Sequence, residues 1–280
     1  MKKFILLFVG LLASFIISIC EVSAENVKFA QITDVHLSAN SEFSINVLKT
    51  AIQDINSQPE ISFVVFTGDN ISNPKEENLK LFAKEIKKLK VPYYVAVGNH
   101  DVYKSGGLSK VKYYEILREA NPFLLQRSAN YKFRKNGFVF LVVDGAKEII
   151  PGSVGYYRED TLKWLEKELS QYDKKQKQVI ILQHFPVEYP QGVESSLRTH
   201  KTYKVENYQV ILSKYHNVLA VITGHFHVNS EHMNDGIYHI SSPSLLQLPN
   251  SYKIIDIVTT KEFSPIIYTR LKEFEVKEQE

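Results

Sequence analysis

ISFVVFTGDN, residues 61–70, is a run of apolar, β-branched and aromatic residues that ends abruptly in Gly68-Asp69-Asn70. Such a run predicts a buried β-strand. The glycine turn that follows delivers the carboxylate of Asp69 at the carboxyl end of this strand. Because ligands of open α/β sheets bind at the carboxyl ends of the strands, Asp69 is the first candidate functional residue.

Four more strand-like runs finish in the same way, with Asp, Asn or His directly after an apolar stretch. In chain order, the residues that follow these runs are Asp34 and His36, then Asn99, His100 and Asp101, then His184, and finally His225 and His227. Unrelated turn or core residues would have to produce this pattern five times in one chain. The sequence therefore predicts one site, built where several strands end.

Length and charge limit the classes of protein to which this chain can belong. Its 280 residues, 44% of them hydrophobic, are compatible with one large α/β domain that has a sizeable core. The formal net charge of +3 is small and evenly spread along the chain. No specific nucleic-acid binding is therefore expected.

The N-terminus has the layout of a secretory signal peptide. Lys2-Lys3 precede the apolar stretch Phe4–Ile19, and Val22-Ser23-Ala24 offers small residues for cleavage. We expect residues 1–24 to be removed and residues 25–280 to form a single domain, exported to the periplasm or secreted. Lipidation of Cys20 is less favoured because the residue before it is large. Membrane contact is expected only through the signal peptide or through such an anchor.

Cysteine usage restricts the chemistry of a metal site. Cys20 is the only cysteine in the sequence, so the mature chain would have neither a disulfide framework nor a thiolate ligand. Any metal ion would have to be held by His, carboxylate and amide groups.

Strand and helix patterns alternate along the mature chain, as they do in an α/β fold. Apolar residues at helical spacing predict helices near 45–55, 79–89, 111–120, 160–170 and 205–215. Strands are expected at 27–32, 61–67, 93–97, 131–133, 138–143, 179–182, 218–223, 237–240, 252–258 and 266–270. The long loop 186–202 is a candidate substrate-facing wall with His200 as a candidate contact, and residues 272–280 are expected to fray.

The five polar strand ends resemble the motif series of the calcineurin-like metallophosphoesterase family. The series is Asp-x-His, Gly-Asp, Gly-Asn-His-Asp, His and Gly-His-x-His, and it extends here from about Val27 to His227. The resemblance implies a four-layer α/β/β/α sandwich with two mixed sheets and a dinuclear metal site at the strand carboxyl ends. It also implies a metal-dependent phosphoric ester hydrolase that acts on a small phosphorylated substrate.

The resemblance also implies a role for each residue that matches a motif. One metal ion would be held by Asp34, His36, Asp69 and His227. The other would be held by Asp69, Asn99, His184 and His225, with Asp69 bridging the two ions. His100 would be the catalytic histidine, oriented by Asp101.

Two divalent ions about 4 Å apart can clamp the oxygens of a phosphoryl group and generate hydroxide near neutral pH. Mixed His, Asp and Asn ligands suit Mn, Fe, Zn or Co better than Mg or Ca, which prefer shells made only of oxygen. We therefore expect an exported two-metal phosphoesterase that hydrolyses a phosphomonoester, phosphodiester or nucleotide through a metal-bound hydroxide.

Differences from the motifs of two subfamilies make membership of either one less favoured. Purple acid phosphatases carry a tyrosine where this chain has Ser72, and they lack a histidine at the position of His36. Ser/Thr protein phosphatases extend Gly-Asp into Asp-Arg-Gly, whereas Asn70-Ile71 follow Asp69 here. What remains is similar to the cyclic-nucleotide phosphodiesterase branch.

Two alternatives remain open at this point. One is a metal-binding pseudoenzyme or binding protein on the same fold, although every ligand implied by the resemblance is present. The other is an unrelated metallohydrolase, which would require a denser His-x-His cluster in the first half of the chain than Asp34-Val35-His36 supplies.

Overall fold

The computed structural model describes residues 26–124, 126–259 and 265–276, and its strands form two mixed sheets. The first sheet has, in spatial order, β11 (Ile266–Glu273), β10 (Ser251–Val258), β1 (Val27–Ile32), β2 (Val64–Thr67) and β3 (Tyr93–Ala96). The second sheet has β4 (Tyr131–Lys135), β5 (Phe138–Val142), β6 (Val179–Leu182), β7 (Val218–Thr223), β9 (Ile237–Ser241) and β8 (Ser230–Asn234).

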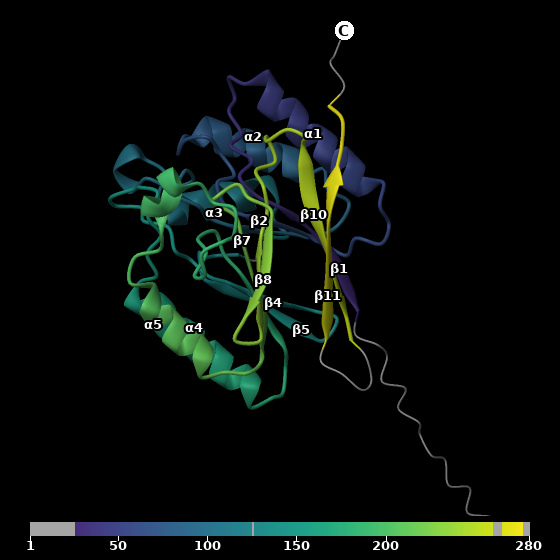
Figure 1. The fold of residues 1–280 in the computed structure, drawn as a ribbon. Coiled ribbons are helices and arrows are strands. Elements are labelled where there is room, and N and C mark those ends of the chain that lie inside the picture. The colour runs from purple at the N-terminus through teal and green to yellow at the C-terminus, as the bar shows by residue number, and fades with distance from the viewer. Residues whose placement is uncertain (1–25, 125, 260–264, 277–280) are drawn as a thin grey trace, which may run out of the picture.

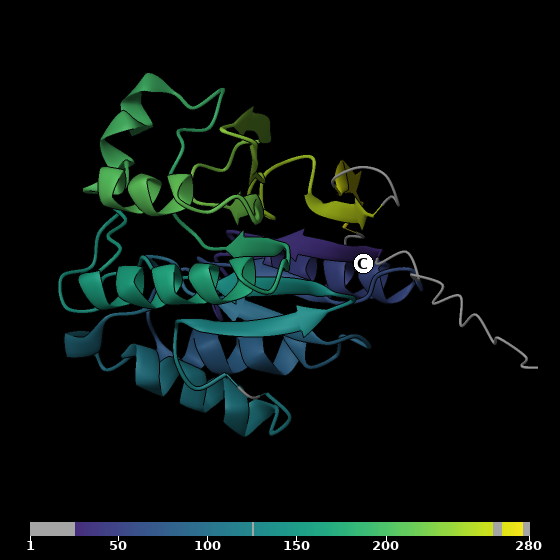
Figure 2. The same ribbon diagram turned by 90° about the horizontal axis from the view of Figure 1, so that it is seen from below.

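Helices cover the outer faces of both sheets. The helices are α1 (Glu42–Asn56), α2 (Glu76–Ile86), α3 (Lys110–Ala120), α4 (Glu159–Asp173) and α5 (Val205–Ser213), with short 3₁₀ turns at η1 (Lys104–Gly106) and η2 (Ser195–His200). Figures 1 and 2 show α1 and α2 on one side of the strands and α4 and α5 on the other. The predicted four-layer α/β/β/α sandwich with two mixed sheets is confirmed.

Side-chain contacts fix each helix layer to its sheet. The ring of Phe82 in α2 packs edge-on against Phe66 of β2, with 5.2 Å between the ring centroids. On the other side, the Tyr208 hydroxyl of α5 donates a 2.7 Å hydrogen bond to Gln183, the residue after β6. Because residues of a strand alternate between faces, the opposite faces of these strands remain free to meet each other.

An apolar layer fills the space between the two sheets. Phe29 of β1 stacks on Phe63 with ring centroids 4.8 Å apart, and the ring of Phe140 from β5 meets both of them edge-on. Offset and edge-on pairs of this kind add to the free energy gained from burying the rings. The sheets are therefore held face to face, with their strand ends in fixed relation.

The core strands run parallel, which brings their carboxyl ends to one edge of the sandwich. β1 pairs in parallel with β2, and β2 with β3, in the first sheet. In the second sheet, β5, β6 and β7 are also parallel neighbours. The polar residues that follow these strands in the sequence therefore gather at the same edge.

The structure corrects the predicted elements in two places: one strand was missed, and one terminal boundary was wrong. β8 was not expected, because Ser230–Asn234 lacks β-branched and aromatic residues; it pairs antiparallel with β9 across the turn Asp235-Gly236. The expected fraying from residue 272 is wrong at its start, because Lys272 and Glu273 pair with β10.

The predicted signal peptide, residues 1–24, lies outside the described residues, as do residues 277–280. Among the helices that are described, none is both long enough and apolar enough to cross a bilayer.

Candidate metal centre

The predicted metal ligands lie together at the common edge of the two sheets, on the turns that directly follow the strands. Five of them have a left-handed backbone: Asp34 (φ 52°), His36 (φ 42°), Asp69 (φ 50°), His225 (φ 75°) and His227 (φ 55°). This conformation is uncommon for residues other than glycine and costs free energy, so it persists where the surroundings enforce it. Its concentration at these five residues marks the edge as a functional site.

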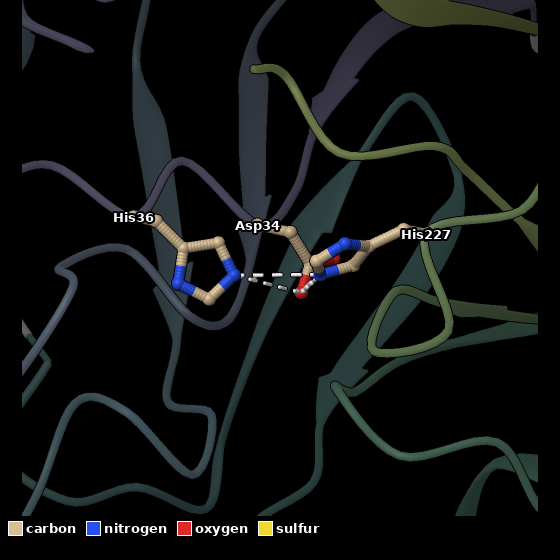
Figure 3. A group of neighbouring side chains, drawn as sticks. All are labelled: Asp34, His36 and His227. Carbon is tan, nitrogen blue, oxygen red and sulfur yellow. Dashed lines mark hydrogen bonds and ion pairs between the residues drawn. The ribbon is translucent and has the colours of Figure 1, made fainter. Parts of the chain in front are cut away.

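One cluster consists of Asp34, His36 and His227, which approach one another from different segments (Figure 3). The His227 Nε2 atom lies 3.1 Å from Asp34 Oδ1 and 3.4 Å from the Nε2 atom of His36. Asp34 and His36 follow β1 of the first sheet, whereas His227 follows β7 of the second. The three ligand atoms thus converge across the gap between the sheets.

A second cluster consists of Asp69, His184 and His225. The His184 Nε2 atom lies 3.3 Å from Asp69 Oδ2, and its Nδ1 atom is 2.9 Å from the carbonyl oxygen of Thr67. Donation to that carbonyl requires the proton on Nδ1, which leaves the Nε2 lone pair for a metal. In the same way, the 3.2 Å contact from His225 Nε2 to the His200 carbonyl leaves Nδ1 of His225 as the ligand atom.

Asp69 lies between the two clusters. Its Oδ2 atom is 3.3 Å from His184 in the second cluster and 4.0 Å from the Nε2 atom of His36 in the first. A third group of possible ligands combines Asp69 with His36 and His100. This position is what a bridging carboxylate requires, and the bridging role itself stays a prediction.

The residues present fit two divalent metal ions. The side-chain atoms Asn99 Oδ1 and His184 Nε2 are buried and make no hydrogen bond, although buried polar atoms in proteins are generally paired. Both are atoms that the predicted ligand set assigns to the second metal ion. A donor set of imidazoles, carboxylates and one amide suits Mn, Fe, Zn or Co.

The buried carboxylates attract positive charge into the site. Burial alone would raise the pKa of Asp34, but the hydrogen bond from His227 and the charge of His184 lower it to about 2. Burial would likewise raise the pKa of Asp69, but the charge of His184 and the hydrogen bond from His184 hold it well below its usual range. Asp34 and Asp69 are therefore anionic across the neutral range, as ligands of metal cations must be.

Glycine is required at two points where a ligand carboxylate meets another strand end. A Cβ atom at Gly98 would lie 2.1 Å from Asp69 Oδ1, and one at Gly224 would lie 2.4 Å from Asp34 Oδ2. The space is used by hydrogen bonds, because Asp69 Oδ1 accepts from the His100 backbone N–H at 2.9 Å. Asp34 Oδ2 accepts from the His225 backbone N–H at 3.0 Å, so each carboxylate has one oxygen held by the backbone.

The predicted orientation of His100 by Asp101 is wrong. The Nδ1 atom of His100 lies 2.9 Å from the backbone carbonyl of Ser72, which takes the place expected for Asp101. Asp101 is fully buried and accepts hydrogen bonds from the backbone N–H groups of Asn70, Ile71 and Gly98. Its carboxylate therefore organises the loop beneath Asp69 and Asn99 and does not touch the imidazole.

Five of the predicted metal ligands line an open cavity of about 910 Å³: His36, Asp69, Asn99, His225 and His227. His200 lines this cavity, as its position in the long loop predicted, and its carbonyl also orients His225. His239 lines a separate cavity with His216, outside the clusters described above. The roles of the Ser72 and Thr67 carbonyls could not be predicted, because a backbone oxygen has no residue type that identifies it.

The position of Asp69 leads to a prediction about metal content. Asp69→Ala is expected to lose more than one metal ion, whereas His36→Ala should weaken mainly one site. Elemental analysis of purified protein measures both. Since bound metal contributes to folding free energy, chelation should also lower the melting temperature. Asp173→Ala, a change on the exposed end of α4, is the control; an Asp69→Ala protein that still holds two ions contradicts the bridging role.

Comparisons with known proteins agree with this geometry. Residues 27–229 match the model of the calcineurin-like phosphoesterase family. The chain is 30% identical over 219 residues to a probable glycerophosphodiester phosphodiesterase from Arcobacter nitrofigilis, a match that covers 70% of each chain. It is 26% identical to a probable cyclic nucleotide phosphodiesterase from Colwellia psychrerythraea, over 79% of this chain and 78% of that one.

The fold agrees as well. A dimetal phosphatase from Danio rerio superposes with a TM-score of 0.64 and 18% identity, over 86% of this chain and 98% of that chain. The chain therefore belongs to the calcineurin-like phosphoesterase family of metal-dependent phosphoric ester hydrolases.

Proposed function

We propose that the protein hydrolyses a small phosphodiester at the metal centre. The observation that carries this proposal is the pair of candidate ligand clusters that meet near Asp69, four of whose residues line an open cavity of about 910 Å³. Sites for small molecules have volumes of about 300–1,000 Å³, so the cavity suits a small ester. The names of the relatives from Arcobacter nitrofigilis and Colwellia psychrerythraea, both phosphodiesterases, support a diester.

Bound metal ions would neutralise phosphoryl charge and lower the pKa of a water molecule so that it can attack phosphorus. The chain's own residues supply the remaining functions. The two ligand clusters would hold the metal ions at the strand ends, next to the phosphoryl group. His200 and Gln247 line the cavity beside them and offer polar groups for the ester substituents.

His100 is the group that we assign to the leaving oxygen. Its Nδ1 atom is engaged by the Ser72 carbonyl, so its Nε2 atom is the one free to carry a proton to the substrate. Nε2 lies 3.9 Å from Asp69 Oδ2, and the residue lines the cavity. A proton donor positioned in this way typically contributes about 10²–10⁴ in rate.

A panel of esters tests the proposed activity. Chelator-treated protein loaded with Mn²⁺ should hydrolyse bis-nitrophenyl phosphate, a glycerophosphodiester or a cyclic nucleotide with higher kcat/KM than the matched monoesters. Chelation should abolish turnover, and added Mn²⁺ should restore it. Faster turnover of the monoesters would contradict the diester assignment. If fully metal-loaded protein hydrolyses no ester, the alternative of a metal-binding protein without activity is favoured.

The role of His100 predicts a dependence on the leaving group. His100→Ala should keep both metal ions but lose about 10²–10⁴ in kcat/KM on alkyl diesters, whose alkoxide leaving group needs a proton. The loss should be much smaller on nitrophenyl esters, since nitrophenolate leaves without one. His216→Ala, at an exposed position, is the control.

Two outcomes would contradict this role for His100. Loss of a metal ion in His100→Ala would identify His100 as a ligand. Equal losses on both classes of ester, with the metal content intact, would indicate that His100 stabilises phosphoryl charge instead of donating a proton.

We also propose that the protein is exported and acts outside the cytoplasm. The support is the sequence pattern of Lys2-Lys3, the apolar stretch and Val22-Ser23-Ala24. Intact-mass analysis of the secreted or periplasmic protein should give a chain that begins at Glu25. A lipid adduct on Cys20, or a retained leader, would overturn this prediction.

A further inference from the structure

A glutamine and a lysine lie buried in the apolar layer between the sheets. On β1, Val27 and Phe29 face this layer, and by the alternation of strand residues Gln31 faces it too. Lys253 of β10 is the cross-strand neighbour of Gln31. Both side chains are fully buried, with 0% of their surface exposed.

The Gln31 amide links three strand ends from both sheets. Its Nε2 donates to Thr67 Oγ1 at 2.9 Å, within the first sheet, and to the Thr223 carbonyl at 2.8 Å, in the second. Its Oε1 accepts from the Ser242 hydroxyl, directly after β9, at 2.6 Å. Both donor hydrogens and the acceptor oxygen of the amide are therefore engaged.

Lys253 also links the two sheets, from β10, the strand next to β1. Its Nζ atom donates to the Ser241 carbonyl at 3.1 Å, and to Asn229 Oδ1 and Glu231 Oε1 at 2.7 Å each. All three acceptors belong to the second sheet or the segment leading into it. A buried ammonium group is tolerated because its three donors are paired in this way.

These connections are made next to the metal ligands in the sequence. Thr67 stands two residues before Asp69, and Thr223 stands two residues before His225. Asn229 follows His227 by two residues in the same way. The first sheet supplies Asp34, His36, Asp69 and Asn99, and the second supplies His184, His225 and His227. The distances between the ligand atoms therefore depend on how the two sheet ends are offset.

We propose that Gln31 and Lys253 are positioning residues that fix the offset of the two sheet ends and so preset the spacing of the metal ligands. Apolar side chains at these positions could hold the sheets together as well, because replacing buried polar groups by packed apolar ones is often neutral or stabilising. Hydrogen bonds, unlike apolar contacts, require a defined distance and direction between donor and acceptor, so they fix the relative position of the strand ends that they join. Outer partners of metal ligands typically affect metal affinity by about 10–100-fold.

Gln31→Met tests the proposal, because it keeps the length of the side chain and removes its hydrogen bonds. Mn²⁺ binding to the chelator-treated full chain is measured by titration calorimetry, and the melting temperature is recorded with and without Mn²⁺. Gln31→Met should weaken Mn²⁺ binding by about 10–100-fold and reduce the rise in melting temperature that Mn²⁺ produces. Lys253→Met should act in the same direction.

The matched control is Tyr131→Phe. The Tyr131 hydroxyl of β4 also links the two sheets, through the backbone N–H and carbonyl of Val95 at 2.8 and 3.0 Å, but it does so between the outermost strands β4 and β3, to the side of β1 and β10. Tyr131→Phe should lower the melting temperature of the metal-free protein and leave Mn²⁺ affinity unchanged. A role for Gln31 in stability alone would make the two variants behave alike.

Wild-type Mn²⁺ affinity in Gln31→Met overturns the proposal. If that variant does not fold, Ser242→Ala decides, since it removes one of the three hydrogen bonds of Gln31. Weaker Mn²⁺ binding in Ser242→Ala supports the proposal, and unchanged binding overturns it. Because the measurement is metal binding and not turnover, a negative result leaves the proposed hydrolysis of diesters untouched.

Discussion

The carboxylate of Asp69 is the contact on which the rest of the site depends. Its Oδ2 atom approaches His184 of the second sheet and His36 of the first, while Oδ1 is held by the His100 backbone. Asp69 can reach both because it stands at the end of β2, an interior strand of the first sheet. The glycine at position 98 and the buried Asp101 are consequences of this placement, since they make room for the carboxylate and hold its loop.

The site is assembled at a cost to the fold. Left-handed backbone at five ligands and two buried anionic carboxylates are each unfavourable alone. They are tolerated because the apolar layer and the helix layers hold the strands rigidly up to the residue before each turn. Bound metal ions would offset part of this cost, because they would stabilise the folded state by binding carboxylates that are already in place. Stability and function are thus coupled at the strand ends.

The sequence was sufficient to locate the candidate ligands and most of the elements, because both leave a residue-type pattern: apolar runs that finish in Asp, Asn or His. It was insufficient where the outcome depends on the direction of a side chain. Asp101 is adjacent to His100 in sequence, yet its carboxylate accepts a hydrogen bond from the backbone N–H of Asn70. The Nδ1 atom of His100 contacts the carbonyl oxygen of Ser72 instead. β8 could have been found from the Asp235-Gly236 turn, although its own residues have low strand propensity.

Gln31 shows a further limit of pattern reading, since one glutamine in an apolar strand predicts nothing by itself. Its meaning comes from the second sheet, where Thr223 and Ser242 meet it. The same reasoning separates what is common in this fold from what distinguishes this chain. Metal ligands at strand ends can serve many phosphate esters, because function on a shared fold is set by the groups added to it. Selectivity must then come from the loop segments around residues 192–200 and 244–247, which line the cavity above the ligands.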